Sequence, residues 1–176
     1  QVCQHTCRRK IKQENWNAQW ERNYTPVVIN ENCVIRAHFH NAITDVKYEI
    51  IITPKMSFGT GHHETTLLMM NEMFDLDFKE KSVLDMGSGT GILAILASKL
   101  GARDLVGIDF DYWAFQNAKE NAGLNNISNI HFIHGDENVL GNEKYDVILA
   151  NINRNSILDN IEIYASVMQD AARMLL

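Results

Sequence analysis

A glycine-rich loop with a preceding carboxylate is the part of the sequence best suited to chemistry. The stretch VLDMGSGTGI (83–92) is a short apolar run that ends at Asp85 and continues into Gly87, Gly89 and Gly91. Glycines at the carboxyl end of a strand let the backbone approach a ligand closely, and open α/β sheets bind their ligands at that end. The sequence therefore predicts a small-molecule site at this loop.

The class of ligand follows from how this loop differs from other nucleotide-binding loops. A dinucleotide fingerprint needs its third glycine at position 92, where the chain has Ile92, and the Gly-Lys-Ser/Thr of a phosphate-binding loop is absent. Asp85 is expected beside the place of a pyrophosphate, which it would repel, whereas a cation would be attracted. S-adenosylmethionine carries a sulfonium and an ammonium group, so the loop favours it over NAD.

Polar residues at the ends of the next three strands extend this candidate site. Asp109 follows Gly91 by 18 residues and is placed to accept hydrogen bonds from both hydroxyls of a ribose. Asp136 is placed to accept from an adenine amino group, although it could equally cap a helix or a turn. Asn151 offers an amide oxygen to a nucleophile above the methyl group of the cofactor. We name no catalytic residue and no metal ligand from the sequence.

The elements that must position these residues alternate between strand and helix from residue 81 onward. We expect strands at 82–86, 105–108, 130–133 and 145–150, helices at 92–100 and 112–124, and a final helix with one apolar face from Ile157 to Leu175. This alternation predicts right-handed crossovers and a doubly wound α/β fold with a mainly parallel sheet.

The segments upstream of this region follow a different pattern. Three runs rich in Val and Ile, at 27–29, 33–39 and 47–53, predict a small antiparallel meander, with His38 and His40 on a polar strand face. We therefore divide the chain into a tail and linker helix (1–26) and a catalytic domain (27–176).

Two further upstream segments carry predictions of their own. A helix is expected at 14–23, where Trp16 and Trp20 share one face and dock it on the domain. The second glycine-rich loop, FGTGHHETT (58–66), leads into a helix at 66–74 that Thr65 would cap.

Composition and charge exclude several classes of function. With 176 residues the chain has room for one domain, and its net charge of −6 argues against a broad grip on nucleic acid. There is no apolar run of membrane-spanning length and no signal-peptide core. Three cysteines are read as free thiols of a cytoplasmic protein, and the spacing of Cys3, His5 and Cys7 is a poor match to a zinc site.

Taken together, the motifs resemble one known family. The joint occurrence of FGTGHHETT, VLDMGSGTGILAILASKLGA, GIDFD and ANINRN, with NWNAQWERNYTPVVI upstream, is similar to PrmA, the bacterial methyltransferases of large-subunit ribosomal protein eleven. The resemblance runs from about Asn15 to about Met168. It implies transfer of methyl groups from S-adenosylmethionine to lysine side-chain and N-terminal amines of that ribosomal protein. It also implies cofactor contacts from Thr66, Gly87, Asp109 and Asn151.

The chain departs from the family at a few internal positions and at both ends. His62 and Glu64 replace the usual Thr and Pro, and Ser88 commonly reads Cys. The family's substrate-recruiting domain is absent before Gln1, and MQDAARMLL stands where a Pro-Gly-Gly turn and three more strands would follow. We therefore expect a truncated core whose strand at 145–150 is an unguarded edge, so that the chain self-associates or is unstable and methylates protein poorly even if it binds cofactor.

Two other functions remain as alternatives at this point. Enzymes that methylate the amino groups of nucleic-acid bases carry an Asn/Asp-Pro-Pro-aromatic element at the fourth strand end, where this chain has Ile152 and Asn153 in place of the prolines. The second alternative is a non-catalytic module that binds S-adenosylmethionine on the same fold.

Overall fold

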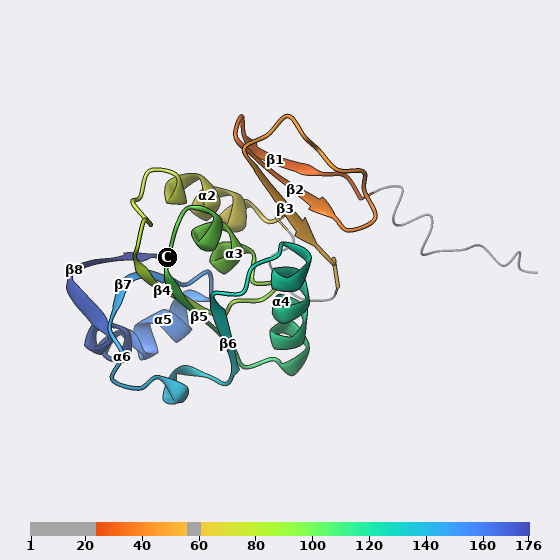
Figure 1. The fold of residues 1–176 in the computed structure, drawn as a ribbon. Helices are drawn as coiled ribbons and strands as arrows, with labels where there is room; N and C mark the ends of the chain where they lie inside the picture. The colour runs from red at the N-terminus through yellow and green to blue at the C-terminus, as the bar shows by residue number, and fades with distance from the viewer. Residues whose placement is uncertain (1–23, 56–60) are drawn as a thin grey trace, which may run out of the picture.

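A five-stranded parallel sheet forms the centre of the computed structural model, which describes residues 24–55 and 61–176 (Figure 1). Its strands lie in the order β6-β5-β4-β7-β8. Their bounds are β4 Ser82–Met86, β5 Asp104–Asp109, β6 Ile130–His134, β7 Tyr145–Leu149 and β8 Met168–Leu175. The order reverses between β4 and β7, and such a switch point opens a crevice at the carboxyl ends of the strands. The predicted doubly wound α/β fold is confirmed.

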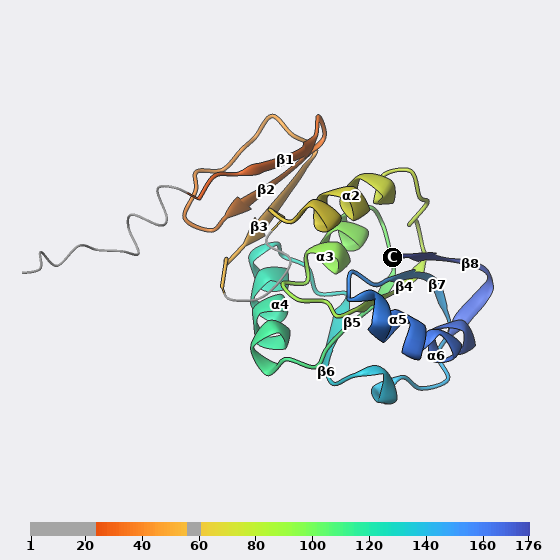
Figure 2. The same ribbon diagram turned by 180° about the vertical axis from the view of Figure 1, so that it is seen from behind.

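Helices cover both faces of this sheet. One face carries α2 (Glu64–Met73), α3 (Ile92–Lys99) and α4 (Tyr112–Leu124), and the other carries α5 (Arg154–Asp159) and α6 (Ile161–Ser166). A short 3₁₀ helix, η1 (Glu137–Val139), follows β6. Figures 1 and 2 show α3 between the large sheet and a second, smaller sheet. Residues 92–97 of α3 are all buried because the helix has a sheet on either side.

The smaller sheet is mixed rather than antiparallel. β1 (Val27–Asn30) and β2 (Cys33–Ala37) are antiparallel, but β3 (Tyr48–Ile52) runs parallel to β2. The predicted meander is therefore wrong for its second connection. Residues 38–47 are long enough to carry the chain back to the starting end of β2, which a tight hairpin cannot do.

The connection between β2 and β3 also displaces the histidines that were expected on a strand. β2 ends at Ala37, and His38 and His40 belong to the turn that follows. The Nδ1 atom of His40 accepts from the Ala37 N–H at 3.2 Å, and its Nε2 lies 2.7 Å from the Tyr24 carbonyl oxygen. The His40 ring therefore stabilises the turn instead of lining a polar strand face.

The C-terminal segment contains two short helices and a strand, not one helix to Leu175. β8 pairs in parallel with β7, with Ile148 opposite Met174 and Leu149 opposite Leu175. Ala171, with φ of 61°, lies in the left-handed region within a stretch where the register shifts. The open hydrogen-bonding row of β7 outweighs the helical spacing of the tail. β7 is consequently an interior strand, and the predicted exposed edge at 145–150 is wrong.

Several predictions concern residues 1–23 and 56–60. Three of them lie outside the described residues: the helix with Trp16 and Trp20, the tail with Cys3, His5 and Cys7, and the start of the second glycine-rich loop.

Cys33 is a free thiol, and burial raises its pKa to about 11. Within the described ranges, no helix combines the length and apolar character that crossing a membrane requires.

Candidate functional site

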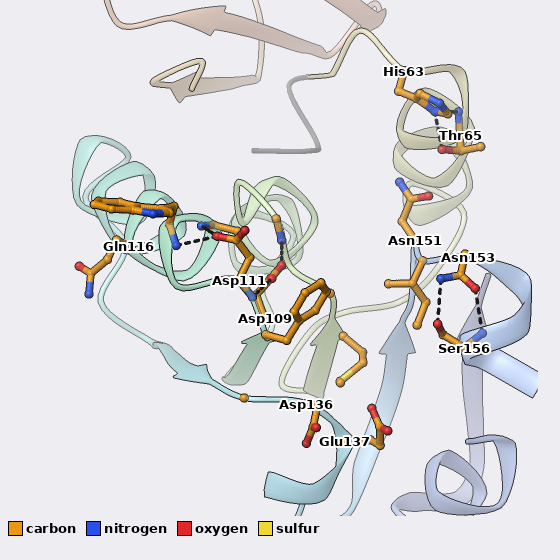
Figure 3. Close-up of a pocket in the computed structure, with 18 of the residues that line it drawn as sticks. His63, Thr65, Asp109, Asp111, Gln116, Asp136, Glu137, Asn151, Asn153 and Ser156 are labelled. Atoms are coloured by element: carbon orange, nitrogen blue, oxygen red, sulfur yellow. Dashed lines mark hydrogen bonds between the residues drawn. The ribbon is translucent and has the colours of Figure 1, made fainter. Parts of the chain in front are cut away.

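A pocket of about 1260 Å³ opens at the carboxyl ends of the parallel strands. The loops after β4, β5, β6 and β7 all contribute to its wall, as the switch-point rule requires. The contributions that matter below are Gly87 and Gly89, Asp109 to Asp111, Gly135 to Glu137, and Asn151 to Asn153. Figure 3 shows Asp109 and Asp111 on one side of the pocket, with Asn151 and Asn153 on the other.

The glycine loop connects β4 to α3 and is held against β5. The N–H groups of Gly87 and Ser88 donate to the Ile108 carbonyl oxygen at 2.8 and 2.9 Å, which fixes the start of the loop on β5. Gly87 has φ of 69°, and a Cβ there would lie 2.2 Å from Cγ2 of Ile152. Gly91, with φ of 77°, is the N-cap of α3. A side chain at Gly87 would therefore collide with the opposite wall of the pocket.

Asp109 is a fixed acceptor at the end of β5. Its side chain is buried, and Oδ2 accepts from the Gly89 N–H at 2.7 Å while Oδ1 accepts from the Asp111 N–H at 2.9 Å. Each carboxylate oxygen has a second lone pair available for a ligand donor. The sequence predicted an acid at this strand end, and the structure places it in the pocket wall with its orientation set.

Asp85 does not face the pocket, contrary to the expectation from the sequence. It shares the α3 face of β4 with Val83, and its Oδ2 accepts from the Ala94 N–H at 3.1 Å. Its Oδ1 is buried without a hydrogen-bond partner among the described residues. Burial, followed by the nearby charge of Asp109, raises the pKa of Asp85 to about 7. Asp85 therefore binds the first turn of α3 and does not repel a ligand directly.

The charge of the pocket comes from other acids. Asp109, Asp111, Asp136 and Glu137 line it, and Lys55 is the one lysine or arginine among the described lining residues. This imbalance favours a cationic ligand, so the preference inferred from Asp85 stands on different residues.

Asp136 combines the two roles that the sequence left open. It lines the pocket, and its Oδ1 accepts from the backbone and side-chain nitrogens of Asn138, both at 3.0 Å, which caps η1. These hydrogen bonds, the backbone one first, hold the pKa of Asp136 below its usual value. The cap leaves Oδ2 for a donor in the pocket.

Asn151 and Thr66 form a pair on the opposite wall. Asn151 lines the pocket, and its Nδ2 donates to Oγ1 of Thr66 at 3.1 Å. Thr66 is fully buried behind Asn151 and is not part of the lining. Because the amide nitrogen is engaged with Thr66, the Oδ1 of Asn151 is left as an acceptor.

The helix that carries Thr66 starts earlier than predicted. α2 begins at Glu64, and its N-cap is His63, whose side chain accepts from the Thr65 N–H. Thr65 was expected as the cap, but it lies inside the first turn, where its Oγ1 is 2.8 Å from Nδ1 of His63. The His63 ring replaces a hydroxyl or carboxylate in the capping role.

Other residues of the pocket were missed by sequence reasoning. Phe110 and Trp113, residues that are 78% and 76% exposed, line the pocket, and Tyr164 of α6 lines it from a buried position. The place of Phe110, directly after Asp109, was a usable signal because strand-end neighbours share the pocket. Tyr164 had no such signal because it reaches the pocket from a helix beyond β7.

The fold and the site define a Rossmann-like domain of the methyltransferase class: a parallel sheet with this switch point, a glycine loop after its first strand and an acid after the second. Residues 1–176 match the family described as Ribosomal protein L11 methyltransferase (PrmA). The chain belongs to this family.

Individual relatives agree with this assignment. The chain is 49% identical over 164 residues to the ribosomal protein L11 methyltransferase of Porphyromonas gingivalis, covering 92% of the chain and 57% of that protein. It is 46% identical over 170 residues to that of Phocaeicola vulgatus, covering 96% and 60%. The chain thus spans less than two thirds of the length of these curated relatives.

A solved structure extends the likeness to three dimensions. The ribosomal protein L11 methylase of Lactobacillus delbrueckii subsp. bulgaricus superimposes with a TM-score of 0.77 at 29% identity, covering 86% of this chain and 78% of that one. A methyltransferase of Thiobacillus denitrificans, with a TM-score of 0.54 at 23% identity, shares the fold.

Proposed function

We propose that this chain is the methyl-transferring core of an S-adenosylmethionine-dependent enzyme that methylates amino groups of ribosomal protein L11. The observation that carries the proposal is the Asp109 carboxylate, held by two backbone N–H groups in the wall of an acidic pocket. In a member of the PrmA family, such an acceptor suits the ribose of an adenosyl cofactor.

The pocket residues fit this cofactor part by part. Asp109 would accept from both ribose hydroxyls, and Gly87 and Gly89 would let the backbone lie against the amino-acid tail. Oδ2 of Asp136 would accept from the adenine amino group. Thr66, which the family resemblance assigns to cofactor contact, would serve the site through its hydrogen bond with Asn151. The volume of about 1260 Å³ exceeds the roughly 300–1,000 Å³ of ordinary ligand sites and leaves room for a substrate side chain.

In methyl transfer to an amine, the main task of the protein is to orient the amine and not to activate it. S-adenosylmethionine supplies a methyl group on a cationic sulfur that departs as a neutral thioether, so no general acid is needed. A lysine amine must arrive deprotonated, which costs about 4.6 kcal/mol at pH 7 for a free side chain. The Oδ1 of Asn151 would accept an amine N–H and aim the nitrogen lone pair into the pocket. Partial desolvation in the pocket lowers the cost of deprotonation.

This proposal also defines partners and location. A ribosomal-protein substrate favours a cytoplasmic location for the reaction. The net charge of −6 disfavours direct contact with nucleic acid.

Calorimetry followed by a transfer assay tests the proposal. We expect the 176-residue chain to bind S-adenosylmethionine and S-adenosylhomocysteine, and not NAD. Transfer of a labelled methyl group to purified ribosomal protein L11 is then measured for the unmodified chain and for Asn151→Ala, whose transfer rate should fall because the acceptor for the substrate amine is removed. Tight NAD binding without a response to either adenosyl ligand would refute the proposal.

A further inference from the structure

Two asparagines of α4 and a third at its C-cap bind the outer edge of β3 and the residue that follows it. Asn117, Asn121 and Asn125 recur every fourth residue, so they share one face of the helix. Asn125 accepts from the Ile51 N–H at 3.0 Å and donates to the Ile51 carbonyl oxygen at 2.6 Å. Asn117 donates to the Thr53 carbonyl oxygen at 3.2 Å. Together these side chains pair with β3 much as a neighbouring strand would, and we call them the asparagine ladder.

Asn121 differs from the other two because it binds two segments at once. Its Oδ1 accepts from the Thr53 N–H at 2.8 Å, and its Nδ2 donates to the Thr90 carbonyl oxygen at 2.9 Å. Thr90 stands between Gly89 and Gly91 in the glycine loop, and the Asn121 side chain is fully buried. One amide group thus connects the loop of the candidate site to the small sheet.

The strand held by the ladder continues to the pocket itself. Thr53 Oγ1 lies 3.4 Å from a carboxylate oxygen of Glu120, and Lys55, two residues further on, forms an ion pair with the same carboxylate. Lys55 lines the pocket. A displacement of β3 along α4 would therefore have two effects at once. It would move Lys55 in the pocket wall, and it would remove the hydrogen bond from Asn121 to the glycine loop.

We propose that Asn121 is a positioning residue of the cofactor site that couples the glycine loop to β3. The inference rests on the proposed cofactor binding at this loop. A ligand that orders the loop favours the Asn121 orientation that also holds the Thr53 N–H. By thermodynamic reciprocity, docking of β3 then favours ligand binding. The small sheet thereby contributes to cofactor affinity although it supplies little of the pocket wall.

Two matched variants separate this role from general support of the fold. Asn121→Asp keeps the acceptor for the Thr53 N–H but replaces the donor to Thr90 with an oxygen. Asn125→Asp keeps the acceptor for the Ile51 N–H and loses its donor to the carbonyl oxygens of Ile51 and Asn121, but it does not touch the glycine loop. Both variants are compared with the unmodified 176-residue chain by calorimetry with S-adenosylhomocysteine, by thermal unfolding without ligand, and by amide hydrogen exchange.

The expected result is a difference between the two variants. Asn121→Asp should weaken S-adenosylhomocysteine binding about 3- to 10-fold, and Asn125→Asp should stay within about twofold of the unmodified chain, at similar losses of thermal stability. S-adenosylhomocysteine should slow exchange of the Thr53 amide in the unmodified chain and in Asn125→Asp, but not in Asn121→Asp.

Two different results would overturn the inference, and they are distinguishable. Equal weakening by both variants, or a Thr53 amide indifferent to the ligand in the unmodified chain, means that the ladder only supports the fold. A failure of the unmodified chain to bind S-adenosylhomocysteine at all removes the proposed function, and the coupling falls with it.

Discussion

Replacement of Asp109 by alanine gives the most direct test of the candidate site. The carboxylate is buried, and two backbone N–H groups donate to its oxygens at 2.7 and 2.9 Å. Its orientation toward a ribose is therefore fixed before the ligand binds. Hydrogen bonds to a charged acceptor contribute about 1.5–3 kcal/mol, which corresponds to a loss of cofactor affinity of roughly 10- to 150-fold. Titration calorimetry with S-adenosylhomocysteine measures this loss.

A control is needed because Asp109→Ala also releases the Gly89 and Asp111 N–H groups. Asp146 is a suitable match: its carboxylate accepts from the Ser82 N–H at 2.9 Å, but it does not line the pocket. Asp146→Ala should lower the melting temperature and leave cofactor affinity unchanged. If Asp109→Ala shows a cooperative thermal unfolding transition and binds cofactor as tightly as the unmodified chain, then Asp109 is only a turn residue and the assignment of the ribose site is wrong.

Three further predictions concern the opposite wall, the buried acid and the last strand. Thr66→Val keeps the shape of the side chain but removes the acceptor for the Asn151 amide; the methyl-transfer rate should fall about tenfold, with cofactor affinity changed by less than about threefold, in parallel rate and calorimetric measurements. Asp85 has a raised pKa in the folded chain, so its contribution to stability is fully present below about pH 4 and is lost as the pH rises through about 7. Between pH 5 and pH 8, the free energy of unfolding measured with denaturant should therefore fall less for Asp85→Asn than for the unmodified chain. Equal losses in the two proteins would contradict the raised pKa of Asp85. Deletion of residues 168–176 leaves β7 as an apolar edge, so sedimentation should detect aggregates that the full chain does not form.

The sequence was informative where local pattern and fold rules agree. The apolar runs of β4 and β7 and the apolar residues 92–97 of α3 predicted a buried parallel sheet, and the strand-end rule then brought Gly87, Asp109 and Asn151 to one pocket. The rule works because all carboxyl ends of a parallel sheet meet at one edge.

The errors arose where tertiary contacts decide the outcome. The segment at 168–175 has helical spacing, but the open row of hydrogen-bonding groups on β7 draws it into a strand. The direction of β3 depends on the path of residues 38–47, which no propensity encodes. The orientation of Asp85 depends on the alternation of β4, which turns its side chain toward the start of α3.

The placement of α3 between two sheets has a consequence for synthesis on the ribosome. β1, β2 and β3 leave the ribosome before the helices that cover them, because their inner face is completed by α2 and α3, and the edge of β3 is completed only by the ladder that ends at Asn125. At about 5–20 residues per second, the remaining stretch of roughly 70 residues takes about 4–15 seconds to appear. During that interval the Ile- and Val-rich strands of the small sheet lack the helices that cover them in the folded protein, so the small sheet cannot reach its folded packing until α4 has been made.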